Sequence, residues 1–217
     1  MQGSPVRALV ALAVVALAVA ALGARVNSAR SAPGTPEITG AERAATFNLD
    51  AVSRDDRAWI LAAVASARPE AQRLIAEVDG LVEVRTDLHE DGAIGLTEIG
   101  PQGVSVNFDV GLLNGDRAID RNIVVLHELG HVIDYLLVDD DTVRSLDAGI
   151  PPAGPCQSAT QDYGACTAVE ERFADTFAKW ALRGRFSLAG SGYGIPTPSS
   201  LEDWGRPLGR LALELAA

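Results

Sequence analysis

In the first segments after residue 46, the apolar residues recur with the spacing of an α-helix. The segment Arg54–Arg68 places its apolar side chains on one side of a predicted helix, and Ser53 precedes it as an N-cap. Pro69 suits the first turn of a second helix over Glu70–Val78, which the turn residues Asp79-Gly80 end. The pattern therefore predicts two helices at the start of the folded part of the chain.

The next apolar positions alternate with polar ones, as in β-strands. Residues Leu81–Leu88 and Val104–Phe108 alternate clearly, and Ala93–Ile99 alternates more weakly. A turn at Pro101-Gln102-Gly103 separates the last two of these segments. We therefore expect a small antiparallel-rich sheet, in which Val104–Phe108 is an edge strand that an extended peptide can pair with.

The C-terminal half of the chain is predicted to be mainly helical. From Asp120 to Val138 apolar residues lie nearly all round a helix, which is the pattern of a buried helix. Further helices are expected over about Thr167–Leu182 and Leu201–Ala216, joined by the Gly/Ser/Pro-rich link Ser187–Ser200. Helices combined with a small sheet predict the α+β fold class.

The first residues of the chain have a different pattern, and we predict that residues 1–32 are a signal peptide or a membrane anchor. Ala8 to Leu22 form an unbroken apolar run of fifteen, which is shorter than the ~20 residues of a typical membrane-spanning helix. Residues 8–24 are therefore a possible membrane attachment. This segment predicts an extracytoplasmic protein, either secreted or anchored by the N-terminal hydrophobic segment.

Composition limits the rest of the chain to one folded domain. The 217 residues are 47% hydrophobic and 22% charged, which is typical of a globular protein. Residues 33–46 are rich in Pro, Gly and Thr and are interpreted as a linker, with a pro-segment as the open alternative. The domain is predicted to cover residues 47–217.

The charge balance argues against nucleic acid as a partner. The chain has 18 Lys and Arg against 29 Asp and Glu, a formal net charge of -11, and it has no basic run. It contains two cysteines, Cys156 and Cys166, in a loop-like stretch rich in proline and glycine. In an oxidising compartment such a pair predicts a disulfide bond.

Metal chemistry is indicated by two of the three histidines. His127 and His131 are four residues apart, so both imidazoles lie on one face of the predicted buried helix and can bind one zinc ion. Glu128 can then act as general base toward a zinc-bound water. Without a metal, three ionisable groups in one buried helix would each cost several kcal/mol.

A third protein ligand must come from elsewhere in the sequence. A third histidine on the same segment is excluded because Leu137 stands at its place, and His89 is interpreted as a solvated histidine beside a turn. Carboxylates of the later helix remain. Glu171 and Asp175 share a face, so one could bind zinc while the other accepts a hydrogen bond from a ligand histidine.

Helical periodicity does not choose between the two neighbouring glutamates at the start of that helix. It places Glu170 nearer the middle of the apolar side than Glu171. A separate solvent-facing side of the same helix is predicted from four polar residues, which are Arg172, Thr176, Lys179 and Arg183.

The two segments together resemble a known family. The run His127-Glu128-Leu129-Gly130-His131, followed by Glu171-x-x-x-Asp175, looks like the gluzincin zinc peptidases, and Phe173-Ala174-Asp175 makes it most similar to the anthrax lethal factor-like metallopeptidases. The resemblance implies a zincin-like metallopeptidase domain with zinc ligands His127, His131 and Glu171. It also implies that Glu128 is the base and that Asp175 supports a ligand histidine.

The same group has a tyrosine shortly before the third ligand that is thought to steady the oxyanion. Tyr163 lies close to that place, with packing as the open alternative for its role. The expected function is a zinc-dependent metalloendopeptidase that holds one Zn2+ ion and acts on a protein or peptide substrate. The alternative is a non-catalytic extracytoplasmic binding protein in which zinc is structural. The sequence does not predict an oligomeric state or the cleavage specificity.

Overall fold

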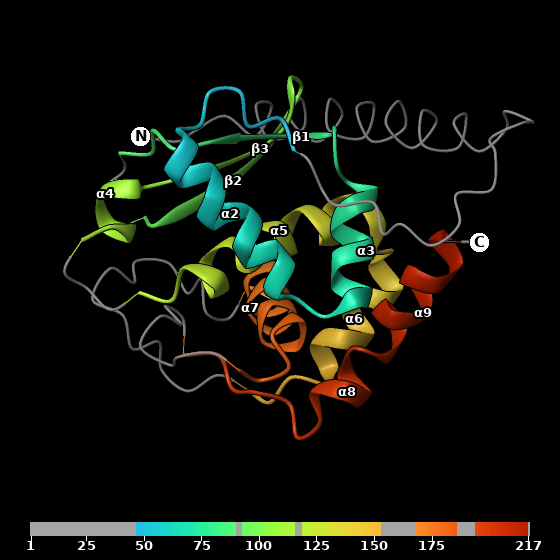
Figure 1. The fold of residues 1–217 in the computed structure, drawn as a ribbon. Coiled ribbons are helices and arrows are strands. Elements are labelled where there is room, and N and C mark those ends of the chain that lie inside the picture. Colours follow the sequence, from blue (N-terminus) through green and yellow to red (C-terminus); the bar gives the residue numbers. More distant parts are fainter. Residues whose placement is uncertain (1–46, 90–92, 116–118, 153–167, 186–193, 217) are drawn as a thin grey trace, which may run out of the picture.

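The computed structural model describes residues 47–89, 93–115, 119–152, 168–185 and 194–216. Figure 1 shows the arrangement: a small sheet lies at the top, helix α5 (Arg121–Leu137) runs beneath it, and helix α7 (Val169–Ala181) lies beneath α5. Helix α5 therefore contacts the sheet on one side and α7 on the other. The mixed α+β class predicted from the sequence is confirmed.

The two helices that open the described chain form as predicted. Helix α2 (Arg54–Ser66) begins after Ser53, whose side chain accepts a hydrogen bond from the Asp56 backbone N–H at 3.1 Å. Helix α3 (Pro69–Glu77) begins at a proline, as predicted. Helix α2 ends before Arg68 because the residue before a proline avoids the helical conformation, and Arg68 has an extended backbone.

The sheet is mixed, so the prediction of an antiparallel sheet is only partly right. Its strands β1 (Val82–Arg85), β2 (Gly95–Gly100) and β3 (Gly103–Phe108) lie in the order β1-β3-β2. Strands β2 and β3 form an antiparallel hairpin, whereas β1 and β3 are parallel. After β2 the chain turns back and β3 enters between β1 and β2, where it runs in the same direction as β1.

This strand order corrects the predicted edge. The strand over Val104–Phe108 is central, with β1 on one side and β2 on the other, so its backbone groups have no free side for a peptide. Strand β1 is covered on its other side by Asn48, whose carbonyl accepts a hydrogen bond from Val84 N. Strand β2 is the other edge strand of this sheet, and among the described residues no strand or bridge pairs with its outer side.

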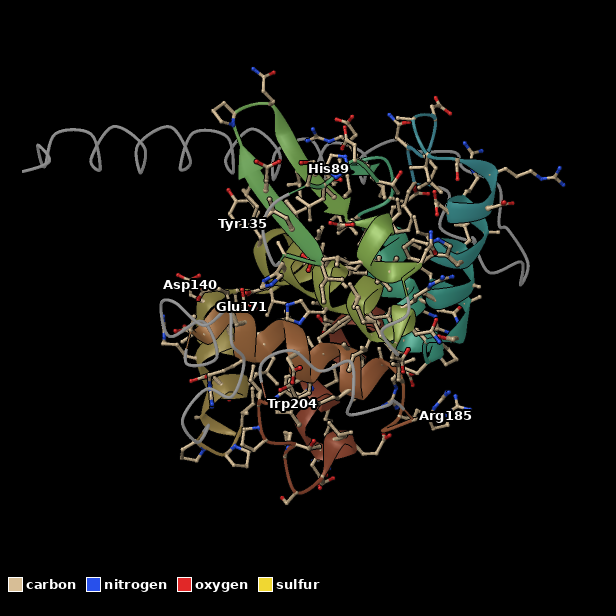
Figure 2. All side chains as sticks on the ribbon, turned by 90° about the vertical axis from the view of Figure 1, so that its left-hand side faces the viewer. His89, Tyr135, Asp140, Glu171, Arg185 and Trp204 are labelled. Carbon is tan, nitrogen blue, oxygen red and sulfur yellow. The ribbon has the colours of Figure 1, made fainter. Side chains whose placement is uncertain are left out.

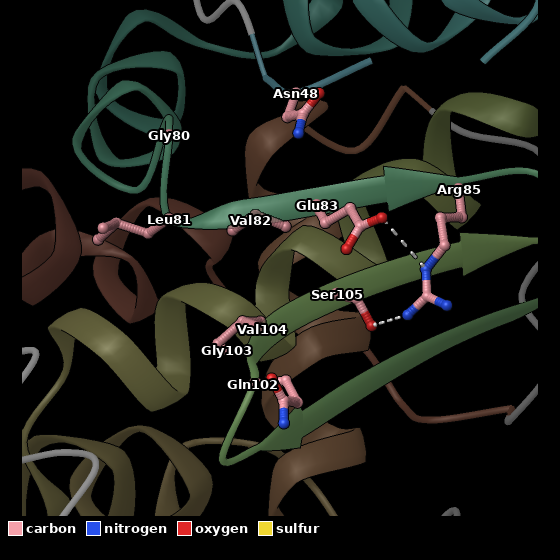
Figure 3. Close-up of a pocket in the computed structure, with 10 residues that line it drawn as sticks. All are labelled: Asn48, Gly80, Leu81, Val82, Glu83, Arg85, Gln102, Gly103, Val104 and Ser105. Atoms are coloured by element: carbon pink, nitrogen blue, oxygen red, sulfur yellow. Dashed lines mark hydrogen bonds and ion pairs between the residues drawn. The ribbon is translucent and has the colours of Figure 1, made fainter. Parts of the chain in front are cut away.

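The two faces of the sheet differ in polarity. Side chains such as Val84, Val106 and Phe108 are buried on the face toward α5. The other face carries Arg85, which donates a hydrogen bond to Ser105 Oγ at 2.8 Å and lies in a cavity of about 230 Å³ (Figure 3). Arg85 is also ion-paired with Glu83, so the charges in this cavity are largely balanced.

Helix α5 is buried as predicted, but the predicted solvent face of α7 is wrong. Arg172, Thr176 and Lys179 are each less than a tenth exposed, whereas the fourth predicted residue, Arg183, is exposed and lies after the end of the helix. The reason is a covering layer that the sequence pattern did not reveal. Arg172 donates hydrogen bonds to Asp147 of helix α6 (Asp140–Ala148) and to the Ile150 carbonyl that follows it.

The last predicted helix is two helices. Helix α8 (Leu201–Trp204) and helix α9 (Arg206–Leu215) are separated at Gly205. Pro207 in the first turn of α9 has no N–H to continue an earlier helix. Gly205 also packs directly on the Trp180 indole, where a Cβ atom would lie 2.0 Å from Nε1. A short helix α4 (Val110–Leu113), which was not predicted, follows the sheet.

Several predictions fall outside the described residues. The predicted export segment (1–32), the possible attachment (8–24) and the linker (33–46) lie there, as do Tyr163 and the pair Cys156 and Cys166. The disulfide bond and the role of Tyr163 therefore stay predictions.

The predicted localisation needs a correction. In the part of the chain that the structure describes, no helix is both long and apolar enough to cross a membrane. The longest of these helices, α5, has 17 residues and contains Glu128, whereas a membrane-spanning helix needs ~20 predominantly apolar residues. The extracytoplasmic assignment, secreted or anchored, is accordingly withdrawn.

Candidate metal centre

Helix α5 places both histidines of the motif at one point. His127 and His131 lie one turn apart, and their Nε2 atoms are 3.2 Å from each other. The rings meet edge to face, with centroids 4.8 Å apart. Because the helix around them is apolar, His127 is only 9% exposed.

Helix α7 adds a carboxylate to this pair. Glu171 Oε2 lies 3.2 Å from His127 Nε2 and 3.6 Å from His131 Nε2. Figure 2 shows Glu171 on α7 at the side of the helix that faces α5. Glu170 is exposed. The structure therefore brings Glu171, and not Glu170, to the histidines, which periodicity alone could not decide.

The three atoms have the geometry of ligands that share an ion. A point equidistant from two Nε2 atoms and one Oε2 atom with these separations lies about 1.9 Å from each. Glu171 Oε2 is buried, and despite the short distances it makes no well-directed hydrogen bond to any of the described residues. His127, His131 and Glu171 thus form a group that could hold a metal ion.

The electrostatics of this group favour a positive charge at its centre. Burial works against ionisation of Glu171, but the nearby His127 and His131 outweigh it and lower the pKa of the carboxyl to about 2. Burial likewise opposes the charged form of His127, yet Glu171, Glu128 and Asp175 together raise its pKa. Without a metal the centre therefore attracts a proton, and a cation can take the place of that proton.

A close helix contact sets the distance between the ligands. At Gly130, between the two histidines, an added Cβ atom would lie 2.9 Å from the Ala174 Cα atom. The absence of a side chain lets the backbones of α5 and α7 approach each other. Glu171, one turn before Ala174, thereby reaches the histidines.

The residue next to His127 faces the sheet. Glu128 is only 6% exposed, and its Oε2 accepts a hydrogen bond from Thr97 Oγ1 of β2 at 2.8 Å. Gly95, two residues before Thr97, leaves room for this carboxylate, because a Cβ atom there would lie 2.5 Å from Glu128 Oε1. The predicted base is thus beside the metal ligands and in contact with the edge strand.

Asp175 of α7 is buried, with 2% of its surface exposed. It is close enough to His127 to help raise the pKa of that imidazole. Its carboxylate also forms an ion pair with Lys179, one turn further along α7, and Lys179 donates a hydrogen bond to the Ile195 carbonyl. The predicted hydrogen bond from a ligand histidine to Asp175 stays a prediction.

Sequence reasoning missed three residues around the site. Gly95 and Thr97 lie in the strand with the weakest alternation, where no pattern indicates contact with Glu128. The four-residue spacing of Asp175 and Lys179 was a usable signal for an ion pair, but Lys179 was assigned to a solvent face. His89 is exposed as predicted, and Figure 2 shows it well apart from Glu171.

Comparisons with known proteins do not assign the chain to a family. No family model matches it, and no curated protein or solved structure matches it either.

Proposed function

We propose that this protein is a zinc-dependent metallopeptidase that cleaves peptide bonds in a protein or peptide substrate. The observation that carries the proposal is the convergence of His127, His131 and Glu171 beside the buried carboxylate of Glu128. The likeness of these residues to the gluzincin motif, and to the lethal factor-like group in particular, supports the same function.

The donor set suits zinc. Two imidazoles and one carboxylate are ordinary zinc ligands, whereas Mg2+ and Ca2+ prefer oxygen donors. Ligands held at ~2.0–2.1 Å in a tetrahedron are about 3.3 Å from one another, and the three atoms here are 3.2 to 3.6 Å apart. Three protein ligands, rather than four, are typical of a catalytic zinc site.

When bound, the zinc ion would supply an activated water and polarise the substrate carbonyl. Glu128 is placed to take the proton from that water and to deliver it to the leaving amine. Thr97 occupies Oε2 of Glu128, which leaves Oε1 for the proton. Burial of Glu128 strengthens its interactions with charge in the site, because the local dielectric constant is low.

The free edge of strand β2 favours a peptide as the substrate. Strand β2 lies beside Glu128 through Thr97 and has a neighbouring strand on one side only among the described residues. An extended peptide commonly adds as a further strand to such an edge. A peptide bound along β2 would therefore pass the metal group and the proposed base.

The alternative is a binding protein with a structural zinc ion and no hydrolysis. Structural zinc sites usually have four protein ligands, and three are found here among the described residues. Replacement of Glu128 separates the two functions. The Glu128→Gln enzyme should retain zinc and lose hydrolysis by at least 100-fold, because general acid–base catalysis contributes about 10²–10⁴-fold.

The most direct test is cleavage of a peptide library by the purified chain loaded with zinc, followed by mass spectrometry. We expect cleavage products with the wild-type protein and none with Glu128→Gln at equal zinc content. Absence of cleavage by a folded, zinc-loaded wild-type protein would contradict the peptidase proposal and favour the binding protein.

A further inference from the structure

We infer that Gly95 and Thr97 of strand β2 are positioning residues that hold the Glu128 carboxylate in its reactive orientation. The inference rests on the proposed function, because it assigns these residues a part in the same site. It goes beyond the ligand set, since neither residue belongs to the motif or to the group of His127, His131 and Glu171. Strand β2 would then serve both as the proposed edge for substrate and as the support of the proposed base.

The first argument is the hydrogen bond. Thr97 Oγ1 lies 2.8 Å from Glu128 Oε2 and 3.1 Å from the Glu128 backbone oxygen. A hydroxyl group has one proton to donate, and a bond to an ionised carboxylate is about twice as strong as a bond to a neutral carbonyl. The carboxylate is therefore the preferred acceptor, and the bond fixes which oxygen of Glu128 remains available.

The second argument is the space at Gly95. A Cβ atom built there would lie 2.5 Å from Glu128 Oε1 and 2.8 Å from its Cδ and Cγ atoms. Every one of these near atoms belongs to the Glu128 side chain, so any side chain at residue 95 would displace the carboxylate. The φ angle of Gly95 is not positive, so the backbone conformation at this position does not require glycine. Close approach of another group is one of the known reasons for a glycine in a strand, and the atoms near Gly95 fit it.

The third argument is the register of the sheet. Thr97 is paired with Val106 and Gly95 with Phe108, which places both residues on the buried face toward α5. Glu98 points to the other face, where it pairs with Arg85. Alternation along β2 thus directs the two positioning residues at Glu128 and keeps the charged residue away from it.

Replacement of the hydroxyl group tests the hydrogen bond. Thr97→Val preserves shape and should lower kcat about tenfold with KM nearly unchanged, as expected for loss of one bond to a charged group. Thr97→Ser should restore most of kcat, because it restores the donor. The affinity for zinc, measured by competition with a chelator, should stay within about twofold of wild type. A parallel loss of zinc affinity would overturn the inference, since Thr97 would then act on the ligands.

Addition of a methyl group tests the space. Gly95→Ala should lower kcat at least tenfold with zinc affinity unchanged, because the base moves and the ligands do not. Gly209→Ala is the matched control: it adds the same group to α9, where nothing lies within 4 Å. Equal activities of Gly95→Ala and wild type would overturn the argument from space.

A measurement without activity separates this inference from the proposed function. In a double-mutant cycle of Thr97→Val with Glu128→Ala, followed by chemical denaturation of the metal-free protein, we expect about tenfold coupling in the unfolding equilibrium constant. If the wild type cleaves peptides but the cycle shows no coupling, the positioning role alone is wrong. If coupling is found but the wild type cleaves nothing, the peptidase function is wrong while the contact is real.

Discussion

Helix α5 packs against both helix α7 and the sheet, and glycine makes these two contacts possible in different ways. Toward α7, Gly130 gives space to backbone atoms of Ala174. Toward the sheet, Gly95 gives space to the carboxylate of Glu128. The α7 contact therefore sets the distance between two helices, and with it the separations of the three candidate ligand atoms. The β2 contact sets only the direction of one side chain.

This difference separates the proposed metal binding from the proposed catalysis. Damage on the α7 side must move a helix, so it should reduce stability and metal affinity together. Damage on the β2 side moves a side chain, so it should reduce turnover while the metal stays bound. Variants of α7 and its surroundings test the first expectation, and the variants of Gly95 and Thr97 test the second.

The largest effect is expected at the buried ion pair of α7. Lys179 and Asp175 are 1% and 2% exposed, so Lys179→Met leaves a carboxylate buried without its cation. We expect a loss of about 3–5 kcal/mol in the free energy of unfolding, measured by urea denaturation. Arg144→Met, which removes an exposed ion pair with Asp141 on α6, should cost no more than about 1 kcal/mol. Equal losses of unfolding free energy in the two variants would show that the buried ion pair stabilises the protein no more than the exposed one does.

Removal of the α7 ligand should have the next largest effect. Glu171→Ala deletes the carboxylate that completes the metal group. We expect the zinc affinity to fall more than about 100-fold, because replacing a residue that only hydrogen-bonds to a metal ligand already costs about 10–100-fold. Glu170→Ala removes an exposed neighbour and should leave the affinity nearly unchanged. Titration of zinc against a chelator measures both. A loss of binding in Glu170→Ala would show that the third ligand has been assigned to the wrong glutamate.

A methyl group at Gly130 should act on the same side with a smaller effect. An added Cβ atom 2.9 Å from the Ala174 Cα atom must separate α5 from α7. We expect Gly130→Ala to lose about 1–3 kcal/mol in unfolding free energy, as in other overpacked cores, and to bind zinc more weakly.

The contrast with Gly95→Ala sharpens the comparison. That variant should retain zinc affinity and lose turnover, whereas Gly130→Ala should lose both. If Gly130→Ala binds zinc as tightly as wild type, the helix contact does not control the ligand distances.

The metal group could be predicted from sequence because its signals are local. Two histidines four residues apart share a helix face by geometry alone, and the buried character of α5 follows from its apolar residues. The third ligand needed the Glu171-x-x-x-Asp175 pattern as well, since periodicity favoured Glu170. The structure brings Glu171 to the histidines because α7 is turned by contacts that its own sequence does not display.

The remaining features depend on contacts between distant segments. The parallel pairing of β1 with β3 and the burial of Lys179 arise from how segments pack, and no local pattern encodes them. Thr97 and Gly95 are both far from Glu128 in the sequence, and Thr97 is separated from it by 31 positions. An amphipathic-helix argument cannot detect such a contact, which explains why the contacts of the proposed base with β2 were missed.

The smallest effect concerns Asp134, one turn after His131 on the α7 side of the site. Burial raises the pKa of this carboxyl to about 6 from 3.8, and Glu170 and Asp140 add to the shift while His131 opposes it. Because the folded protein binds the proton more tightly than the unfolded chain, stability falls as the pH rises from about 4 to 6, and the cost is fully present at pH 7. Asp134→Asn should therefore stabilise the metal-free protein at pH 7.

The expected gain is about 1–2 kcal/mol after allowance for the partial exposure of the side chain. It should vanish near pH 4, where Asp134 is protonated in the folded protein. Urea denaturation at both pH values, with a chelator present, measures the difference. Bound zinc should reduce the gain, since a cation close to His131 favours the ionised carboxylate. A gain of the same size at pH 4 and pH 7 would mean that the introduced amide stabilises by packing and that Asp134 does not titrate abnormally.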